Sequence, residues 1–94
     1  MKGSPYRKRY ILIQFADPRS CDYLSSETRR IFNTREKFRN ETFIIVKTDQ
    51  FLKEQVCNFI EQKINGVRII TVSGTIKKCK TNVKILSNEH FQIA

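Results

Sequence analysis

The residues best suited to bind another molecule lie in one segment, SGTIKKCKTNVK, which spans residues 73–84. A Ser-Gly-Thr turn precedes four lysines there, and no acidic residue interrupts them. Ser73 or Thr75 can cap a helix that begins at the turn, and Gly74 has no side chain to hinder a close approach by another backbone. Free N–H groups at a helix start attract anions, and lysines add full positive charges. These features predict contact with phosphates, with four candidate cations: Lys77, Lys78, Lys80 and Lys84.

Either secondary structure separates charge from apolar residues in this segment. As a helix over residues 75–84, it brings Ile76, Cys79 and Val83 together and places lysines on the adjoining face. As a strand, it also puts lysines and apolar residues on opposite sides. The alternative interpretation is that Ser-Gly-Thr is only a turn and the lysines are a solvated face, because a glycine turn with lysines is a weak signal by itself.

A second basic cluster, Arg7, Lys8 and Arg9, lies between Tyr6 and Tyr10. Cations beside aromatic rings that can stack on bases are typical of RNA-binding surfaces. The alternative is a charged terminus that favours solubility, with Tyr10 packed in the core. A third group is interrupted by acids, and we interpret most of it as a solvated face with intrahelical pairs: Arg29, Arg30, Arg35, Lys37 and Arg39.

The sequence offers little for catalysis or metal binding. Acid–base cleavage of RNA requires a matched pair of proton-transfer groups, and the one histidine, His90, cannot provide it. Cys21, Cys57 and Cys79 form no C-x-x-C pair and lie at no zinc-ligand spacing from His90. Their odd number and wide separation fit reduced thiols in an intracellular protein. We therefore expect no catalytic site, no metal site and no cofactor.

The charge of the chain points to a polyanionic partner. The 94 residues contain 18 Lys and Arg against 9 Asp and Glu, which gives a net charge of +9 and an isoelectric point near 9.8. Such a balance suits nucleic acid or an anionic membrane surface, and we favour nucleic acid because the charges are clustered. No apolar run approaches the roughly 20 residues of a membrane-spanning helix, and we expect no signal peptide.

The length suits one domain, residues 1–94, with a basic arm at 1–8 and a short tail at 87–94. β-branched and aromatic residues predict three strands in between. They are YILIQFA at 10–16, TFIIVK at 42–47 and VRIITVS at 67–73.

Helices are predicted between these strands. The clearer one, residues 50–64, has Thr48-Asp49 as its cap and Asn65-Gly66 as a left-handed stop. Its apolar stripe is Leu52, Val56, Phe59 and Ile60. The other lies within residues 19–40, where serines can cap it, although residues 32–38 could equally form an edge strand. This order predicts an α/β sandwich with helices on one sheet face and the other face free for partners.

Four stretches, in order, resemble the small protein subunit shared by ribonuclease P and ribonuclease MRP in archaea and eukaryotes, the Pop-five family. They are RKRYILIQF near the start, DPRSCDYLSSE, NETFIIVKTDQF before the clearer helix, and TVSGTIKKCK. The last is the most specific, since members of this family carry a V-x-G-T-I-[KR] element after their final strand. The resemblance covers residues 7–80.

The resemblance implies a non-catalytic subunit that supports a catalytic RNA in removing 5′ leaders from precursor tRNA. It implies an α+β fold, an α/β sandwich whose antiparallel sheet carries helices on one face, related to the RNA-recognition (ferredoxin-like) fold. It also implies a barrel-type protein subunit among the partners, and a location in the nucleus (nucleolus) of a eukaryote or the cytoplasm of an archaeon. The motif, carried over residue by residue, indicates six RNA contacts: Arg9, Ser73, Gly74, Thr75, Lys77 and Lys78.

The chain departs from the family pattern in two places. Family members usually have a long first helix followed by a two-stranded hairpin, and we expect the interval between Asp17 and Thr42 to be too short for both. Gln14 stands where an acid is common. The sequence therefore predicts a reduced version of the fold.

Two other functions fit parts of the sequence. A generic single-strand RNA-binding module of the RNA-recognition type would carry a Gly-Phe strand signature, which YILIQF and TFIIVK lack. A small acylphosphatase-like hydrolase would match in length, charge and order of elements. Its phosphate loop would have to follow the first strand, where this chain has ADPRSCD.

Overall fold

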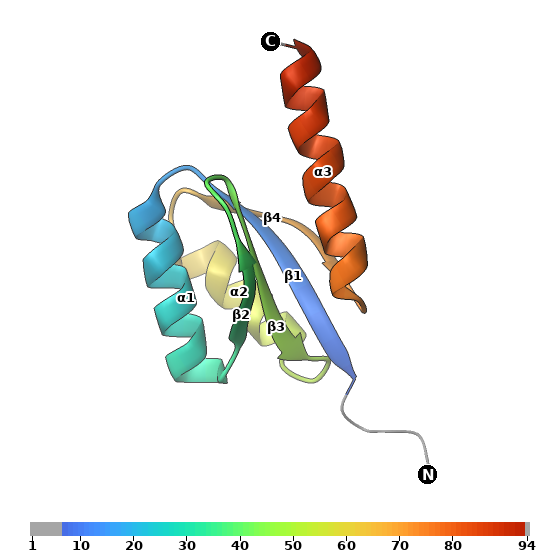
Figure 1. Cartoon of the computed structure of the whole chain (residues 1–94). Helices are drawn as coiled ribbons and strands as arrows, with labels where there is room; N and C mark the ends of the chain where they lie inside the picture. The colour runs from blue at the N-terminus through green and yellow to red at the C-terminus, as the bar shows by residue number, and fades with distance from the viewer. Residues whose placement is uncertain (1–6, 94) are drawn as a thin grey trace.

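In this computed structural model, the described part of the chain, residues 7–93, contains four strands that pair in one antiparallel sheet (Figure 1). Side chains are described for residues 7–86. The order across the sheet is β2-β3-β1-β4, so the first strand lies in the interior and the second at an edge. The strands are β1 (Lys8–Phe15), β2 (Arg35–Arg39), β3 (Phe43–Asp49) and β4 (Val67–Ser73).

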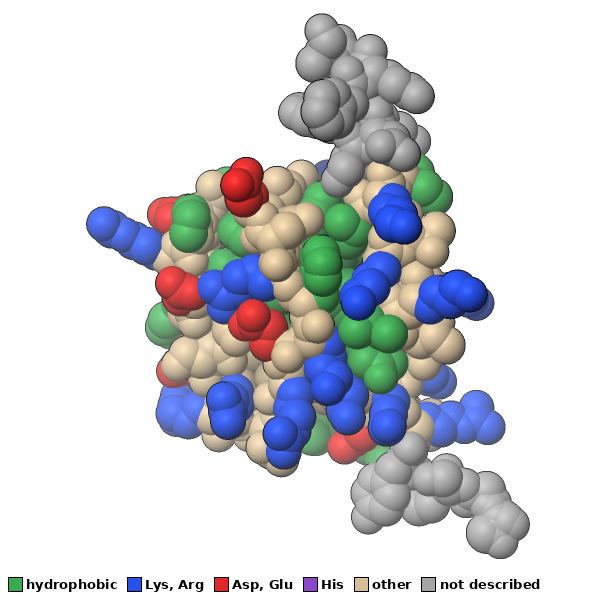
Figure 2. All heavy atoms as spheres, viewed as in Figure 1, with side chains coloured by type: hydrophobic (Ala, Val, Ile, Leu, Met, Phe, Trp, Pro, Cys, Tyr) green, Lys and Arg blue, Asp and Glu red, His purple; other side chains and the backbone are tan. Residues whose placement is uncertain are grey.

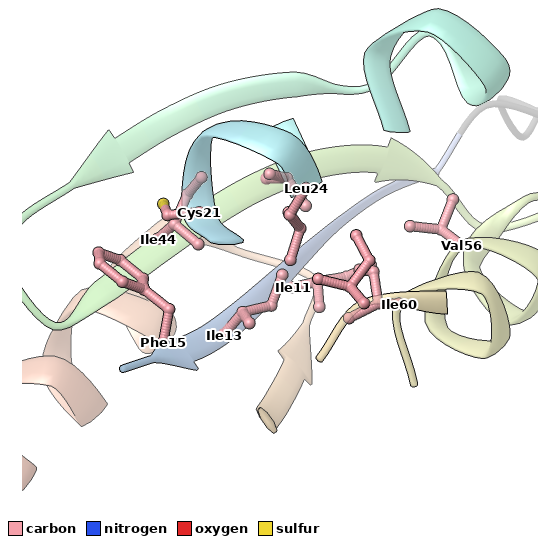
Figure 3. Packing of buried hydrophobic residues seen from close by; sticks show 10 residues of the cluster. Ile11, Ile13, Phe15, Cys21, Leu24, Ile44, Val56 and Ile60 are labelled. Atoms are coloured by element: carbon pink, nitrogen blue, oxygen red, sulfur yellow. The ribbon is translucent and has the colours of Figure 1, made fainter. Parts of the chain in front are cut away.

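Two helices, α1 (Pro18–Phe32) and α2 (Lys53–Lys63), cover one face of the sheet. Side chains alternate between the two faces of a strand, so every second residue of β1 and β3 points into this core. Figure 3 shows these side chains directed toward apolar residues of the two helices. The strand residues are Ile11, Ile13, Phe15 and Ile44, and the helix residues are Cys21, Leu24, Val56 and Ile60.

A third helix, α3 (Ile76–Ile93), lies against the opposite face (Figure 1). Cys79 and Val83 pack there on Leu12, Phe43 and Ile45. The expected α+β class is confirmed. The expectation that all helices lie on one face is wrong, because α1 and α2 share a face and α3 lies on the other. The reason is that β1 and β3 are apolar on both faces, so burying only one face would leave large side chains in water.

The expectation that the interval between Asp17 and Thr42 is too short for both a helix and a hairpin is wrong. This interval contains α1 and then β2, which forms a hairpin with β3. Asn33, with φ of 58°, ends α1 in the left-handed region that asparagine tolerates. The side chain of Asn40 then accepts hydrogen bonds from the N–H groups of Thr42 and Phe43 at 2.8 and 2.7 Å, which closes the hairpin. The order β-α-β-β-α-β with this strand order is the ferredoxin-like arrangement.

The helix starts differ in detail from the prediction. α1 is capped not by a serine but by Asp17, whose carboxylate accepts a hydrogen bond from the Arg19 N–H at 2.9 Å. Asp49 accepts hydrogen bonds from the amides that follow it, and α2 begins only after this turn, at Lys53. Gly66, with φ of 78°, ends the connection to β4 in the left-handed conformation that was predicted.

The two ends of the described chain also differ from the prediction. β1 already begins at Lys8, so the expected arm over residues 1–8 extends too far, and Arg7 and Lys8 are exposed at the start of this strand. Tyr6 lies outside the described residues. α3 continues to Ile93, so the expected tail from residue 87 is helical instead.

The cysteines and the hydropathy of the helices add little to the fold. Cys21 and Cys79 are buried on opposite faces of the sheet, Cys57 is half-buried, and all three are unpaired thiols. Across residues 7–93, none of the helices combines the length and apolar character needed to cross a membrane.

Candidate nucleic-acid interface

The two basic segments singled out in the sequence meet at one end of the sheet. β1 and β4 pair so that Tyr10 lies opposite Ser73, and the start of β1 runs beside the turn that follows β4. A Cβ placed on Gly74 would lie 3.0 Å from Nη1 of Arg9. Gly74 therefore leaves room for the guanidinium of Arg9, and its contact with RNA stays a prediction.

The turn at the start of α3 uses its own side chains to satisfy backbone donors. The hydroxyl of Ser73 accepts a hydrogen bond from the Thr75 N–H at 3.3 Å, and the hydroxyl of Thr75 accepts one from the Lys78 N–H at 3.4 Å. Thr75, one of the two predicted candidates, is thus the capping residue. Because these two N–H groups are already occupied, lysine side chains must supply most of the attraction for an anion at this end of α3.

The lysines of α3 lie outside its packed face, as the helical spacing predicted. Cys79 and Val83 are buried against the sheet. The ammonium of Lys80 lies 5.7 Å from the centroid of the Phe38 ring, within the range of a cation–π contact. Phe38 belongs to β2, so this contact places Lys80 of α3 beside the edge strand. All four predicted lysines are exposed: Lys77, Lys78, Lys80 and Lys84.

Three cations that the sequence analysis did not select as site residues lie beside this surface: Arg35, Lys37 and Lys47. In the sheet register Lys47 lies opposite Arg35 and opposite Tyr10, which places Lys8 one diagonal step away on the same face. Partial burial, and then the charges of Lys8, Lys37 and Arg35, lower the pKa of Lys47. A bound anion would reduce this repulsion between like charges, so their proximity favours anion binding.

These three residues were missed for an identifiable reason. Arg35 and Lys37 fall in a stretch that the sequence leaves open between helix and edge strand, and their acidic neighbours favour a solvated face, whereas in the structure both lie on β2. Lys47 lies at the end of the predicted apolar strand, and a single lysine at that position does not indicate a binding site. Alternation along β3 does place it on the face opposite Val46, but only the strand order shows that Arg35 and Lys8 lie on either side.

Two other arginines, Arg30 and Arg39, are paired with acidic side chains and are less suited to bind an anion. Arg30 pairs with Glu27 at 2.7 Å within α1, as predicted, and Arg39 pairs with both Asp22 and Glu36. The side chains of residues 7–86 form no further ion pair. None of the cations described above therefore has an acidic partner in that part of the chain.

Together these residues form what we call the basic face, on the α3 side of the sheet. Figure 2 shows Lys and Arg side chains gathered along the lower end of the sheet and along α3, whereas most of the acidic side chains visible in this view lie at the upper left. The face is made by β1, β2, β3 and α3. Its members are Lys8, Arg35, Lys37, Lys47, Lys77, Lys80 and Lys84, with Arg9 and Lys78 at its border.

Comparison of the chain with protein-family models, with curated proteins and with solved structures finds no match. The resemblance to the Pop-five family therefore stays a prediction that depends on the quoted motifs. In the part of the chain with described side chains, His, Cys, Asp and Glu form no group of three or more that could hold a metal ion.

Proposed function

We propose that this protein is a non-catalytic, RNA-binding subunit of a ribonucleoprotein of the ribonuclease P type, serving ribonuclease P or ribonuclease MRP. Its task would be to neutralise phosphates that crowd together where a structured RNA folds, so that the RNA holds its active shape. The RNA, not this chain, would cleave the 5′ leader of precursor tRNA.

The observation that carries the proposal is the convergence of cations from four elements on one face. Lys8, Lys47 and Arg35 come from three strands, and lysines of α3 continue the face without an acidic partner among the described side chains. A solvated surface requires no such convergence, and like charges placed this close repel one another. A phosphate backbone that lies across the face would offset this repulsion.

The position of α3 favours contact with the backbone over reading of bases. An RNA-recognition module stacks bases on the open face of its sheet. Here α3 packs on that face through Cys79 and Val83, and Tyr10 is half-buried against the same cluster. This supports the structured-RNA proposal over the generic single-strand module, because flexible lysines recognise phosphate and sugar rather than sequence.

The hydrolase alternative gains no support from the loop after β1. Only Ala16 and Asp17 separate β1 from α1, and the Ala16 N–H donates to the carbonyl of Gly66 at 3.0 Å. The carboxylate of Asp17 occupies the start of α1, where a phosphate would have to bind. Assays of the purified protein on RNA and on acyl phosphates test this point. Turnover that a single substitution abolishes would overturn the non-catalytic assignment.

The experiment that tests the proposal is capture of a tagged protein from its source cell, with sequencing of the bound RNA and identification of the bound proteins. We expect one abundant structured RNA and a barrel-type protein subunit. A variant with Lys77→Ala, Lys78→Ala and Lys80→Ala should lose most of the RNA. Capture of scattered messenger RNAs would favour the generic module, and capture of no RNA by the unchanged chain would contradict both RNA proposals.

A further inference from the structure

A hollow of about 340 Å³ lies at the end of the sheet, beside the basic face. Segments far apart in the chain line it: the start of β1, the end of α1, the start of β2 and the end of β3. The cationic residues that line it are Arg7, Lys8, Arg35 and Lys47, together with one acidic residue, Asp49. A hollow of this size can admit a phosphate group together with part of the molecule that carries it.

The hollow combines the two kinds of cation that suit a phosphate group. Arg7 and Arg35 carry planar guanidinium groups that can bind two phosphate oxygens at once, whereas Lys8 and Lys47 supply compact charges. The four cations less Asp49 leave a formal charge of +3. This excess suits an anion with several charged oxygens, such as a phosphomonoester with up to two negative charges or a phosphodiester with one.

The acid in the hollow is already engaged by its own turn. Oδ1 of Asp49 accepts hydrogen bonds from the N–H groups of Phe51 and Leu52, at 2.8 and 2.9 Å. These bonds hold the carboxylate against the backbone between β3 and α2. Lys8 lies opposite Asp49 in the register of β1 and β3, but no ion pair joins the two among the described side chains.

Two further features favour an anionic partner at this site. The pKa of Lys47 is lowered by partial burial and by the neighbouring charges of Lys8, Lys37 and Arg35, and a bound anion would remove much of this penalty. Thr48, also in the wall of the hollow, has a buried hydroxyl that makes no hydrogen bond with any described residue. Buried polar groups normally have a partner, so each exception calls for an explanation.

We propose that this hollow is a phosphate-binding site, separate from the lysines of α3. The phosphate belongs either to an RNA strand that crosses the basic face or to a small phosphorylated molecule. The proposal depends on the hollow alone, and it stands whether or not the lysines of α3 bind RNA.

Titration with inorganic phosphate, followed by NMR of the backbone amides at constant ionic strength with chloride as the reference anion, tests the proposal. Saturable shifts should be confined to residues 7–8, 33–35 and 47–52. Lys47→Gln and Arg35→Gln, made separately, should each weaken the affinity about tenfold, since each removes a charged partner. Lys63→Gln, an exposed position on α2, is the matched control and should leave the affinity unchanged.

The source of the phosphate is distinguished by competition with a structured RNA. Displacement of inorganic phosphate by RNA assigns the site to the RNA backbone. Simultaneous binding of both, without displacement, assigns it to a small phosphorylated molecule. Shifts that chloride reproduces at equal ionic strength, or that survive in both the Lys47 and the Arg35 variant, would overturn the proposal. Such a failure would leave the salt dependence of RNA binding by α3 intact, so the two proposals can fail independently.

Discussion

At the scale of single residues, Gly66 and Gly74 are glycines for different reasons. Gly66 has φ of 78°, a conformation that L-residues with a side chain adopt at a cost. A Cβ there would meet Ser20 only at 3.5 Å, so space is not the constraint. Gly74 has no such backbone constraint, and its neighbour at 3.0 Å is the flexible end of Arg9.

The same substitution should therefore have a larger effect on stability at Gly66 than at Gly74. Gly66→Ala should lower the free energy of unfolding by roughly 1–2 kcal/mol because of its backbone conformation. Gly74→Ala should change it by less than about 0.5 kcal/mol but displace the guanidinium of Arg9. Denaturant unfolding of both variants measures this difference. Equal destabilisation would show that the turn after β4 is constrained in a way that its backbone does not reveal.

A second residue-scale prediction concerns the buried thiol of Cys21. Burial, the largest effect, raises its pKa from the ordinary 9.0 to about 11, while Arg39 opposes this shift. Below pH 9 the thiol is protonated in both states and contributes no pH dependence. Between pH 9 and 11 the unfolded chain loses this proton and the folded chain keeps it, so stability should fall by roughly 1–2 kcal/mol.

Unfolding by denaturant at several pH values from 8 to 11 checks this prediction, with Cys21→Ala as the reference. The variant will be less stable at every pH because it leaves a cavity. Its loss of stability above pH 9 should nevertheless be smaller than that of the unchanged chain. Parallel curves for the two proteins would show that Cys21 does not titrate differently on folding.

At the scale of elements, α3 both covers apolar residues of the sheet and presents lysines to solvent. Val83 is only 7% exposed against the sheet, whereas Ile85, on the same helix, is 49% exposed. Val83→Ala should therefore cost about 1–3 kcal/mol of stability, and Ile85→Ala, as the matched control, less than about 0.5 kcal/mol. Thermal and denaturant unfolding measure both. A negligible effect at Val83 would mean that α3 is not docked as described.

Most elements could be predicted from local patterns, and the exceptions have physical causes. VRIITVS coincides with β4, and the helix predicted over residues 50–64 coincides with α2 except at its ends, because composition, periodicity and the turn residue agree. The sequence does not decide between helix and strand for β2, because β2 is a short edge strand whose register shifts between Glu36 and Phe38, which breaks the alternation that marks a strand. The packing of α3 on the sheet was missed because the sequence cannot show which face of β1 and β3 its apolar stripe meets.

At the scale of the whole molecule, the basic face arises from the order of the strands. Placing β1 between β3 and β4 brings Lys8 near Lys47 and brings Arg9 near Gly74. The sequence identified the clusters at residues 7–9 and 73–84 but could not predict that they would meet, nor that β2 would add Arg35. The net charge of +9 is thus concentrated in part on one side, which suits an extended polyanion.

The most direct test of RNA binding by this face is the salt dependence of affinity for a structured RNA. We predict that Lys77→Ala, Lys78→Ala and Lys80→Ala together lower the slope of log affinity against log salt by about 0.7 to 0.9 per lost phosphate contact. Three charges removed from α1 and α2, by Arg19→Ala, Lys53→Ala and Lys63→Ala, should leave the slope nearly unchanged. An unchanged slope in the α3 variant, or an equal reduction in the control, would contradict the account.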